Sequence, residues 1–382
     1  MNNINYLTRI LIDFGALSEL HQECLQLGIE RPLVVTDAGI RSLGILSQLL
    51  SGIEDIDVAV FDQTPSNPHE SAVLAARDLF LKHKADGIIA LGGGSSIDCA
   101  KGVAIMASHA GELKTYATIE GGSSKITDQV PKIIAIPTTA GTGSEVARGA
   151  ILIVADGRKL GFHSWNLMPK LAILDPLLTL SLPPVLTAAT GMDAIAHCME
   201  TFMSSAFNPP ADGIALDGLE RGWRNLEKAV LNGDNKDARL QMMSASMQGA
   251  MAFQKGLGCV HSLSHSLGGI NPRLHHGTLN ALFLPSVVQF NQMDPTLQSQ
   301  NKMQRMAYAM GLGHPANAGQ EIAMAIKDMC ERLGLPKGLK DYGVHNQQFD
   351  AIISGALKDH CHLTNPVVAS AEDYKDILLH SL

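Results

Sequence analysis

Residues 87–98 read GIIALGGGSSID, a short apolar run that passes directly into three glycines and two serines. The apolar run predicts a buried strand, and the serines predict the first turn of a helix. Glycine has no Cβ, so the turn leaves backbone N–H groups open to a pyrophosphate at the positive end of that helix. The same glycines also suit an ordinary tight turn, and the G-x-G-x-x-G dinucleotide pattern is not present. This segment alone therefore leaves both interpretations open.

The sequence around this segment repeats the same alternation of strand and helix. Further apolar runs rich in Ile and Val predict strands, and residues 69–84 have the three- and four-residue apolar spacing of a helix. Strands that alternate with helices imply crossover connections and a mostly parallel sheet covered on both faces. The expected strands are Arg9–Phe14, Pro32–Thr36, Asp57–Phe61, Gly87–Leu91, Lys132–Pro137 and Ala150–Val154.

The character of the sequence changes after Asp175-Pro176. From about Pro183 onward there is no convincing strand, and long helical patterns are broken only at glycines and prolines. We therefore predict an α/β domain at residues 1–182 and an all-helical domain at residues 183–382. A cleft between two domains is the expected place for a site.

Two other strand ends support a bound nucleotide. Residues 137–145, PTTAGTGSE, form a small, hydroxyl-rich loop suited to close contact with a ribose or phosphate. In an open α/β sheet, ligands bind at the carboxyl ends of neighbouring strands. Asp37 ends the second strand, where a carboxylate can accept hydrogen bonds from a ribose. Asp37 would serve equally well as a helix N-cap.

The helical half concentrates histidines in apolar surroundings. In TGMDAIAH at 190–197, Asp193 and His197 are four residues apart and share one helix face. The segment GCVHSLSH at 258–265 repeats this spacing with two histidines, and a further pair follows at 275–276. A single histidine there is usually a hydrogen-bonded core residue, but several with a carboxylate are costly to bury unless paired or ligated. Imidazoles and one carboxylate suit iron or zinc.

Composition excludes several classes of protein. The 382 residues are 46% hydrophobic and 17% charged, and no basic stretch interrupts the formal net charge of −8, so nucleic-acid binding is not expected. No run of about 18 apolar residues predicts a membrane span, and residues 1–14 lack the features of a secretory signal. Six scattered cysteines with no C-x-x-C pair predict reduced thiols and a cytoplasmic protein.

Four segments resemble one known family, in the same order and over nearly the whole chain. They are GGGS at 92–95, PTTAGTGSE at 137–145, AATGMDAIAH at 188–197 and the histidine block at 261–277. In these segments the chain resembles the iron-dependent (group III) alcohol dehydrogenases. The last two segments together are highly specific, whereas the glycine turn is not. The resemblance implies a Rossmann-like N-terminal domain, a helical metal-binding domain, and metal and cofactor in the cleft between them.

The resemblance also implies the site residues. The family's metal-ligand pattern falls on Asp193, His197, His261 and His276. Many members have one residue fewer before the last histidine, which would favour His275. We prefer His276 because the sequence HGTLNA resembles the helix start that follows the ligand. The implied contacts to the cofactor, NAD, are Asp37, Asn67, Gly93, Gly94, Ser95, Asp98, Thr138, Thr139, Thr142 and Lys159.

One further histidine, His265, matches a residue that faces the catalytic site without binding the metal. We assign it to proton relay; the alternative is that it orients a metal ligand. The predicted function is then an NAD(H)-dependent alcohol dehydrogenase or aldehyde reductase. In it a divalent metal, Fe²⁺ or alternatively Zn²⁺, polarises the substrate oxygen during hydride transfer.

Other functions remain open from the sequence. One is a zinc polyol dehydrogenase of the glycerol type, and another is a metal- and NAD-dependent lyase like the dehydroquinate synthases. A redox or metal sensor would bind NADH and metal without turnover. We expect a small alcohol or aldehyde as substrate and a homo-oligomer. The sequence gives neither the identity of the substrate nor the number of subunits.

Overall fold

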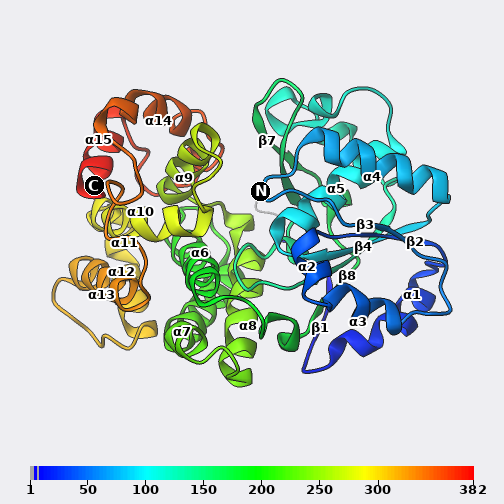
Figure 1. Ribbon diagram of the computed structural model, residues 1–382. Coiled ribbons are helices and arrows are strands. Elements are labelled where there is room, and N and C mark those ends of the chain that lie inside the picture. Colours follow the sequence, from blue (N-terminus) through cyan, green and yellow to red (C-terminus); the bar gives the residue numbers. More distant parts are fainter. Residues whose placement is uncertain (1–3, 7) are drawn as a thin grey trace. The chain divides into compact units, whose positions relative to one another are not determined.

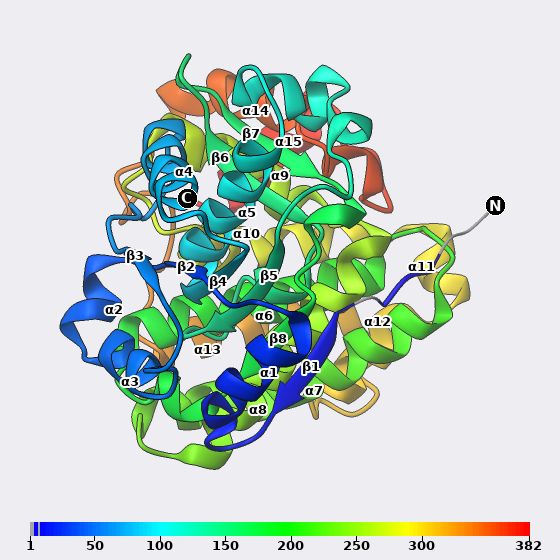
Figure 2. The same cartoon turned by 90° about the vertical axis from the view of Figure 1, so that its right-hand side faces the viewer.

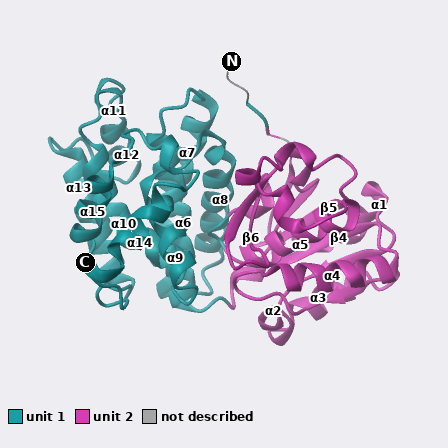
Figure 3. Cartoon of the chain, turned by 90° about the horizontal axis from the view of Figure 1, so that it is seen from above, with its two compact units in different colours: residues 1–5, 140–142, 182–382 teal, residues 6–139, 143–181 magenta. Residues whose placement is uncertain are grey.

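The computed structural model describes residues 4–6 and 8–382. The chain divides into two compact units (Figure 3). The α/β unit comprises Tyr6–Thr139 and Gly143–Ser181, and the helical unit comprises Leu182–Leu382 with Ala140–Thr142 and residues 4–5. Within the described part of the chain, no helix combines the length and apolar character that a membrane crossing requires.

The α/β unit is built on a six-stranded sheet in which every pair of neighbours is parallel. Its strand order is β1-β8-β5-β4-β2-β3. In the register of the sheet, Gly92 lies opposite Pro137 at the carboxyl ends of β4 and β5. The two loops that the sequence singled out therefore leave the sheet side by side. The bounds are β1 (Arg9–Ile12), β2 (Pro32–Val35), β3 (Ala59–Phe61), β4 (Gly87–Gly92), β5 (Lys132–Pro137) and β8 (Leu171–Leu174).

Helices cover both faces of this sheet. Figure 1 shows α4 (Glu70–His83) and α5 (Gly94–Ser108) on one side and α1 (Leu20–Leu27) and α3 (Ile45–Ser51) on the other, and Figure 2 shows the same division. Successive residues of β4 serve the two cores: Ile88 and Ala90 face α4 and α5, whereas Ile89 and Leu91 face α1 and α3. A parallel strand buried on both faces reads as a continuous apolar run, as this one does.

One predicted strand does not belong to the parallel sheet. The segment expected at 150–154 is β6 (Gly149–Ile153), which pairs antiparallel with β7 (Lys159–His163) in a separate hairpin. Every residue of β4 is buried, because helices cover both faces of the parallel sheet. Along β6 buried and half-buried residues alternate, because only one face of the hairpin is covered. Strands β7 and β8 were not anticipated. Four-residue apolar runs such as β8 are too short for periodicity to distinguish from loops.

The helical unit is arranged around α6 (Pro184–Met203), which is buried along most of its length. It packs against α7 (Pro209–Leu231), α8 (Lys236–Ala252) and α10 (His276–Asn291). Helix α9 (Cys259–Ile270) packs against α10 and α14 (Phe349–Ala356). The other α-helices there are α11 (Pro295–Ser299), α12 (Lys302–Ala309), α13 (Ala318–Arg332) and α15 (Ala371–His380). Residues 183–382 are all described and contain no strand, which confirms the predicted fold class.

Candidate functional site

Three helices bring four side chains to one point in the helical unit. Asp193 and His197 lie one turn apart on α6, His261 comes from α9, and His276 is the first residue of α10. The three Nε2 atoms lie 3.7, 3.6 and 3.6 Å from the same Oδ1 atom of Asp193. Tetrahedral ligands bound at roughly 2.0–2.2 Å from an ion are about 3.3–3.6 Å apart. The spacing of the three histidines from Asp193 suits one divalent ion, and the donor atoms of Asp193, His197 and His261 also lie within 4.8 Å of one another.

A close approach of two helices carries His276 to this point. A Cβ atom on Gly277 would collide with the carbonyl oxygen of Ala189 and lie 3.3 Å from the Asp193 Cβ. Only glycine lets the start of α10 pass so near to α6. In the HGTLNA segment, the glycine therefore permits the close packing of the two helices, and the histidine supplies the donor atom.

The neighbouring histidine is placed differently. The backbone N–H of His275 donates to the Tyr342 hydroxyl at 2.9 Å, and its buried Nδ1 has no hydrogen-bond partner among the described residues. His276, by contrast, points its Nε2 toward Asp193. The geometry favours His276 over His275 as the fourth ligand.

The cluster is buried and rich in negative charge. Burial opposes ionisation of Asp193, but the nearby histidines, led by His197, hold the pKa of that carboxyl well below its usual range. Burial lowers the pKa of His197 to about 4, so its imidazole is neutral and keeps a lone pair for an ion. Burial opposes protonation of His261, but Glu200 and Asp193 raise its pKa to about 9. Its imidazolium therefore compensates the buried carboxylates until an ion takes the place of the proton.

Glu200 supports the ligands, and sequence reasoning missed it. One of its carboxylate oxygens is hydrogen-bonded to His261 Nδ1, and the other accepts from the Val260 backbone N–H at 2.8 Å. The bond to Nδ1 places the proton there and leaves Nε2 free to face the cluster. Glu200 follows His197 by three residues on α6, so the helical spacing would have indicated that it shares the same face.

Asn280 provides a test of whether an ion fits. Its Nδ2 atom lies 2.7 Å from Asp193 Oδ1, 3.2 Å from His261 Nε2 and 3.1 Å from His276 Nε2. Its Oδ1 is buried and has no hydrogen-bond partner in the described part of the chain. An amide has only two N–H groups and cannot satisfy three acceptors. Once His261 Nε2 has lost its proton, the cluster has more lone pairs than donors, which is the condition that a bound cation relieves.

The predicted relay histidine lies beside the ligands. The ring of His265 stacks on His276 with centroids 5.3 Å apart, and its Nδ1 is 3.0 Å from Asp359 Oδ2. Phe253 meets His197 edge-on at 5.2 Å and adds an apolar wall. Asp359 was not anticipated, because it lies 94 residues from His265 in the sequence.

The glycine turn of the α/β unit has the geometry of a phosphate loop. Gly92 adopts φ 142°, and a Cβ there would be 2.6 Å from the Ser96 hydroxyl. Among residues 4–6 and 8–382, no side chain caps α5 at Gly93, so N–H groups of its first turn remain for an anion. The backbone N–H of Thr138 donates to the Gly92 carbonyl at 3.1 Å and ties the second loop to the first.

Asp37 takes one of the two roles that the sequence left open, that of a helix N-cap. Its Oδ1 accepts from the Ile40 N–H at 3.0 Å and caps α2 (Ala38–Ser42). Its Oδ2 accepts from the Ser96 hydroxyl at 3.2 Å, which brings the carboxylate next to the first turn of α5. The capping interaction therefore does not remove Asp37 from the loop region.

Most of the other expected cofactor residues have contacts within the protein. Asn67 accepts from Lys159 Nζ at 2.9 Å, and burial lowers the pKa of that lysine. Asp98 is buried, and its two oxygens accept from the Ser144 hydroxyl at 2.6 Å and the Ile151 N–H at 2.9 Å, so it anchors loop and hairpin. Ser95 donates to the Ser66 carbonyl, and Gly94 is the first residue of α5. Thr139 lies beside Gly93, whereas Thr142 belongs to the helical unit.

A buried lysine that sequence reasoning missed organises the same loop. Lys101 Nζ donates to the carbonyl oxygens of Ser144, Ala147 and Gly149 at 2.7–2.8 Å. Burial lowers its pKa to about 8, against the opposing effect of Asp98 and Glu145. Lys101 follows Asp98 by three residues, so both side chains lie on the same face of α5. Together they hold residues 144–151 in place through hydrogen bonds.

Two family models match this chain, one in each half. Residues 8–176 match the family described as iron-containing alcohol dehydrogenase, and residues 187–382 match the C-terminal part of the Fe-containing alcohol dehydrogenase family. A 4-hydroxybutyrate dehydrogenase of Cupriavidus necator is 59% identical over 99% of both chains.

Two solved structures have the same fold over the whole chain. A 1,3-propanediol oxidoreductase superposes with a TM-score of 0.94 at 34% identity and covers 100% of both chains. The sulfoacetaldehyde reductase of Bifidobacterium kashiwanohense, solved in complex with NAD⁺, superposes with a TM-score of 0.89 at 27% identity. That superposition covers 100% of this chain and 98% of the reductase.

Proposed function

The chain belongs to the iron-containing alcohol dehydrogenase family, and we propose on this basis that it interconverts 4-hydroxybutyrate and the corresponding aldehyde acid with NAD(H). It is an oxidoreductase that acts on CH–OH groups, as its relatives are. The substrate is proposed from the 59% identity to a 4-hydroxybutyrate dehydrogenase across the whole chain.

A single observation carries the metal centre: three histidine Nε2 atoms surround one oxygen of Asp193 at 3.6–3.7 Å. We propose that Asp193, His197, His261 and His276 hold a divalent ion, Fe²⁺ or alternatively Zn²⁺. Such an ion supplies Lewis acidity, which lowers the pKa of an alcohol or polarises a carbonyl. Four protein ligands with a single carboxylate would leave the centre with net positive charge, suited to a developing alkoxide.

Residues around this centre are proposed to orient the metal ligands and to move the proton of the substrate hydroxyl. Glu200 holds the His261 tautomer, and the apolar edge of Phe253 shields His197 from water. His265, held by Asp359, is placed to pass the hydroxyl proton between the substrate and solvent, since its side chain is 20% exposed. In this proposal His265 transfers the proton and the metal ligands do not.

The α/β unit is proposed to bind NAD, which accepts or donates the hydride. The uncapped first turn of α5 and the bare turn at Gly92 would receive the pyrophosphate, and Asp37 would receive the adenosine ribose. The superposition on a reductase solved with NAD⁺ supports this assignment. A cytoplasmic location and a homo-oligomeric state stay predictions.

A substrate panel tests the proposed function. We expect turnover of 4-hydroxybutyrate with NAD, and a kcat/KM at least about tenfold higher than for 1,3-propanediol, ethanol or glycerol when Fe²⁺ is supplied anaerobically. Activity on glycerol with Zn²⁺ and none on 4-hydroxybutyrate would support the polyol dehydrogenase instead. Binding of NADH without turnover of any alcohol would support the alternative that the protein is a redox or metal sensor.

The fourth ligand is tested by a matched pair of variants. We expect His276→Ala to lower metal affinity by at least about tenfold, since even residues that only orient a ligand cost that much. His275→Ala should retain both metal and activity, because it is His276 whose Nε2 lies 3.6 Å from Asp193 Oδ1. Metal content after dialysis decides the assignment. Loss of the ion in His275→Ala but not in His276→Ala would show that His275 is the fourth ligand.

A further inference from the structure

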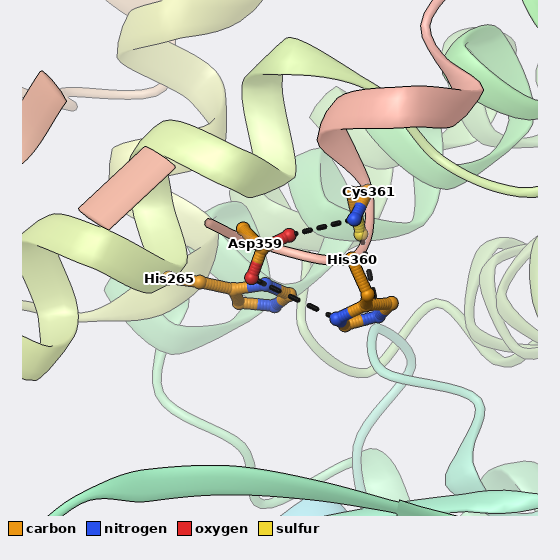
Figure 4. A group of neighbouring side chains, drawn as sticks. All are labelled: His265, Asp359, His360 and Cys361. Atoms are coloured by element: carbon orange, nitrogen blue, oxygen red, sulfur yellow. Dashed lines mark hydrogen bonds and ion pairs between the residues drawn. The ribbon is translucent and has the colours of Figure 1, made fainter. Parts of the chain in front are cut away.

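A second group of metal-binding side chains lies beside the proposed centre and shares none of its four ligands. It consists of His265 on α9 and of Asp359, His360 and Cys361, which follow α14 (Figure 4). Their donor atoms all lie within 4.8 Å of one another. We propose that these four residues form a second binding site for a divalent transition-metal ion.

The four side chains are close enough to share one ion, since one donor atom from each residue lies within 4.8 Å of all the others. Asp359 Oδ2 is 3.0 Å from His265 Nδ1 and 3.7 Å from His360 Nδ1, and Cys361 Sγ is 3.4 Å from His360 Nε2. Ligands of a tetrahedral zinc site, at roughly 2.0–2.3 Å from the ion, are about 3.3–3.8 Å apart. His360 would bind the ion through one of its two nitrogens, so side-chain rotation would bring the four donors to these separations.

The backbone already orients the carboxylate. The Cys361 N–H donates to Asp359 Oδ1 at 2.8 Å, so that oxygen is held by the turn. The other oxygen, Oδ2, faces both imidazoles, as Figure 4 shows. Burial opposes ionisation of Asp359, but His265 and His360 keep the pKa of its carboxyl well below its usual range. The group therefore contains a permanent negative charge.

The remaining donors favour a soft or borderline cation. Burial lowers the pKa of His360, so its imidazole is neutral and offers a lone pair. Burial raises the pKa of the Cys361 thiol, so the thiol keeps its proton until an ion displaces it. Two imidazoles, a thiolate and a carboxylate suit Zn²⁺ rather than Mg²⁺ or Ca²⁺. The side chain of His360 is 50% exposed, which gives an ion a path from solvent.

Occupation of this site would have a consequence for catalysis. It would engage His265, and, if His265 relays the proton as proposed above, excess Zn²⁺ would inhibit turnover. This consequence rests on the proposed function, whereas binding of the second ion does not. A binding measurement therefore separates the two.

Cobalt provides a spectroscopic test that reports only on the second site. The proposed catalytic ligands contain nitrogen and oxygen alone, so a near-ultraviolet thiolate-to-Co²⁺ charge-transfer band can come only from a site with cysteine. We expect anaerobic Co²⁺ titration of the metal-loaded enzyme to give this band and to saturate at one added ion per chain. The band should persist in His261→Ala, which lacks a proposed catalytic ligand.

Three variants identify the ligands. Cys361→Ser should abolish the band, and His360→Ala should weaken Co²⁺ binding by at least about tenfold. His314→Ala, which removes another exposed histidine, should leave both unchanged. Because His360 is half exposed, its variant is expected to fold, and circular dichroism checks this. Absence of the band in the wild type, or an unchanged titration in His360→Ala, would overturn the proposal.

Discussion

Replacing His261 with alanine is expected to lower kcat/KM by at least about a thousandfold while NADH still binds. The variant removes one of the three Nε2 atoms around Asp193 Oδ1 and leaves Glu200 without its partner. Lewis-acid stabilisation is worth several kcal/mol, and each 1.36 kcal/mol is a factor of ten in rate. Steady-state kinetics gives the loss, and fluorescence titration gives the affinity for NADH.

The matched control is His314→Ala, because it deletes an exposed imidazole outside the cluster. This control should keep near wild-type kcat/KM and metal content. If His261→Ala also lost NADH binding, the variant would be misfolded, and Glu200→Gln, which keeps the shape of that side chain, would replace it. Full activity of His261→Ala would contradict the metal centre.

The second large effect concerns the choice of cofactor. We expect the wild type to prefer NAD over NADP by ten- to several-hundredfold, and Asp37→Gly to narrow that ratio. A carboxylate facing a 2′-phosphate at a partly exposed position costs roughly 1–4 kcal/mol, and each 1.4 kcal/mol is about tenfold in affinity. The measurement is the ratio of kcat/KM for NAD and NADP in each protein.

Asp37→Asn separates the charge of this side chain from its capping role. Asparagine can still cap α2 through its Oδ1, and its Nδ2 can donate to the Ser96 hydroxyl in place of the bond that the carboxylate accepts, but it carries no charge. The asparagine variant should therefore narrow the NAD/NADP ratio much as the glycine variant does, with less loss of stability. An unchanged ratio in both variants would mean that Asp37 only caps the helix.

Local patterns predicted the architecture because they reflect local physics. The apolar runs of β4 and β5 are buried on both faces, and the spacing of Asp193 and His197 follows from one helical turn. The sequence did not indicate which strands pair, so β6 was expected in the parallel sheet although it forms a hairpin with β7. Pairing depends on tertiary contacts that periodicity does not record.

The supporting residues were harder to predict than the ligands. Glu200 and Lys101 lie on the helix faces of expected site residues, so a search at helical spacing would have found them. Asp359 had no such signal, since it follows α14 and meets His265 only in the folded chain. His275 and His276 have the same side chain, and the path of the backbone into α10 is what places one of them toward Asp193.

Anomalous diffraction at the metal absorption edge, from crystals of anaerobically purified active enzyme, tests the metal centre most directly. The predicted result is an anomalous peak bounded by the Nε2 atoms of His197, His261 and His276 and by the Asp193 carboxylate. A peak coordinated by other residues, or no peak in crystals of protein that keeps full activity in chelator, would contradict it.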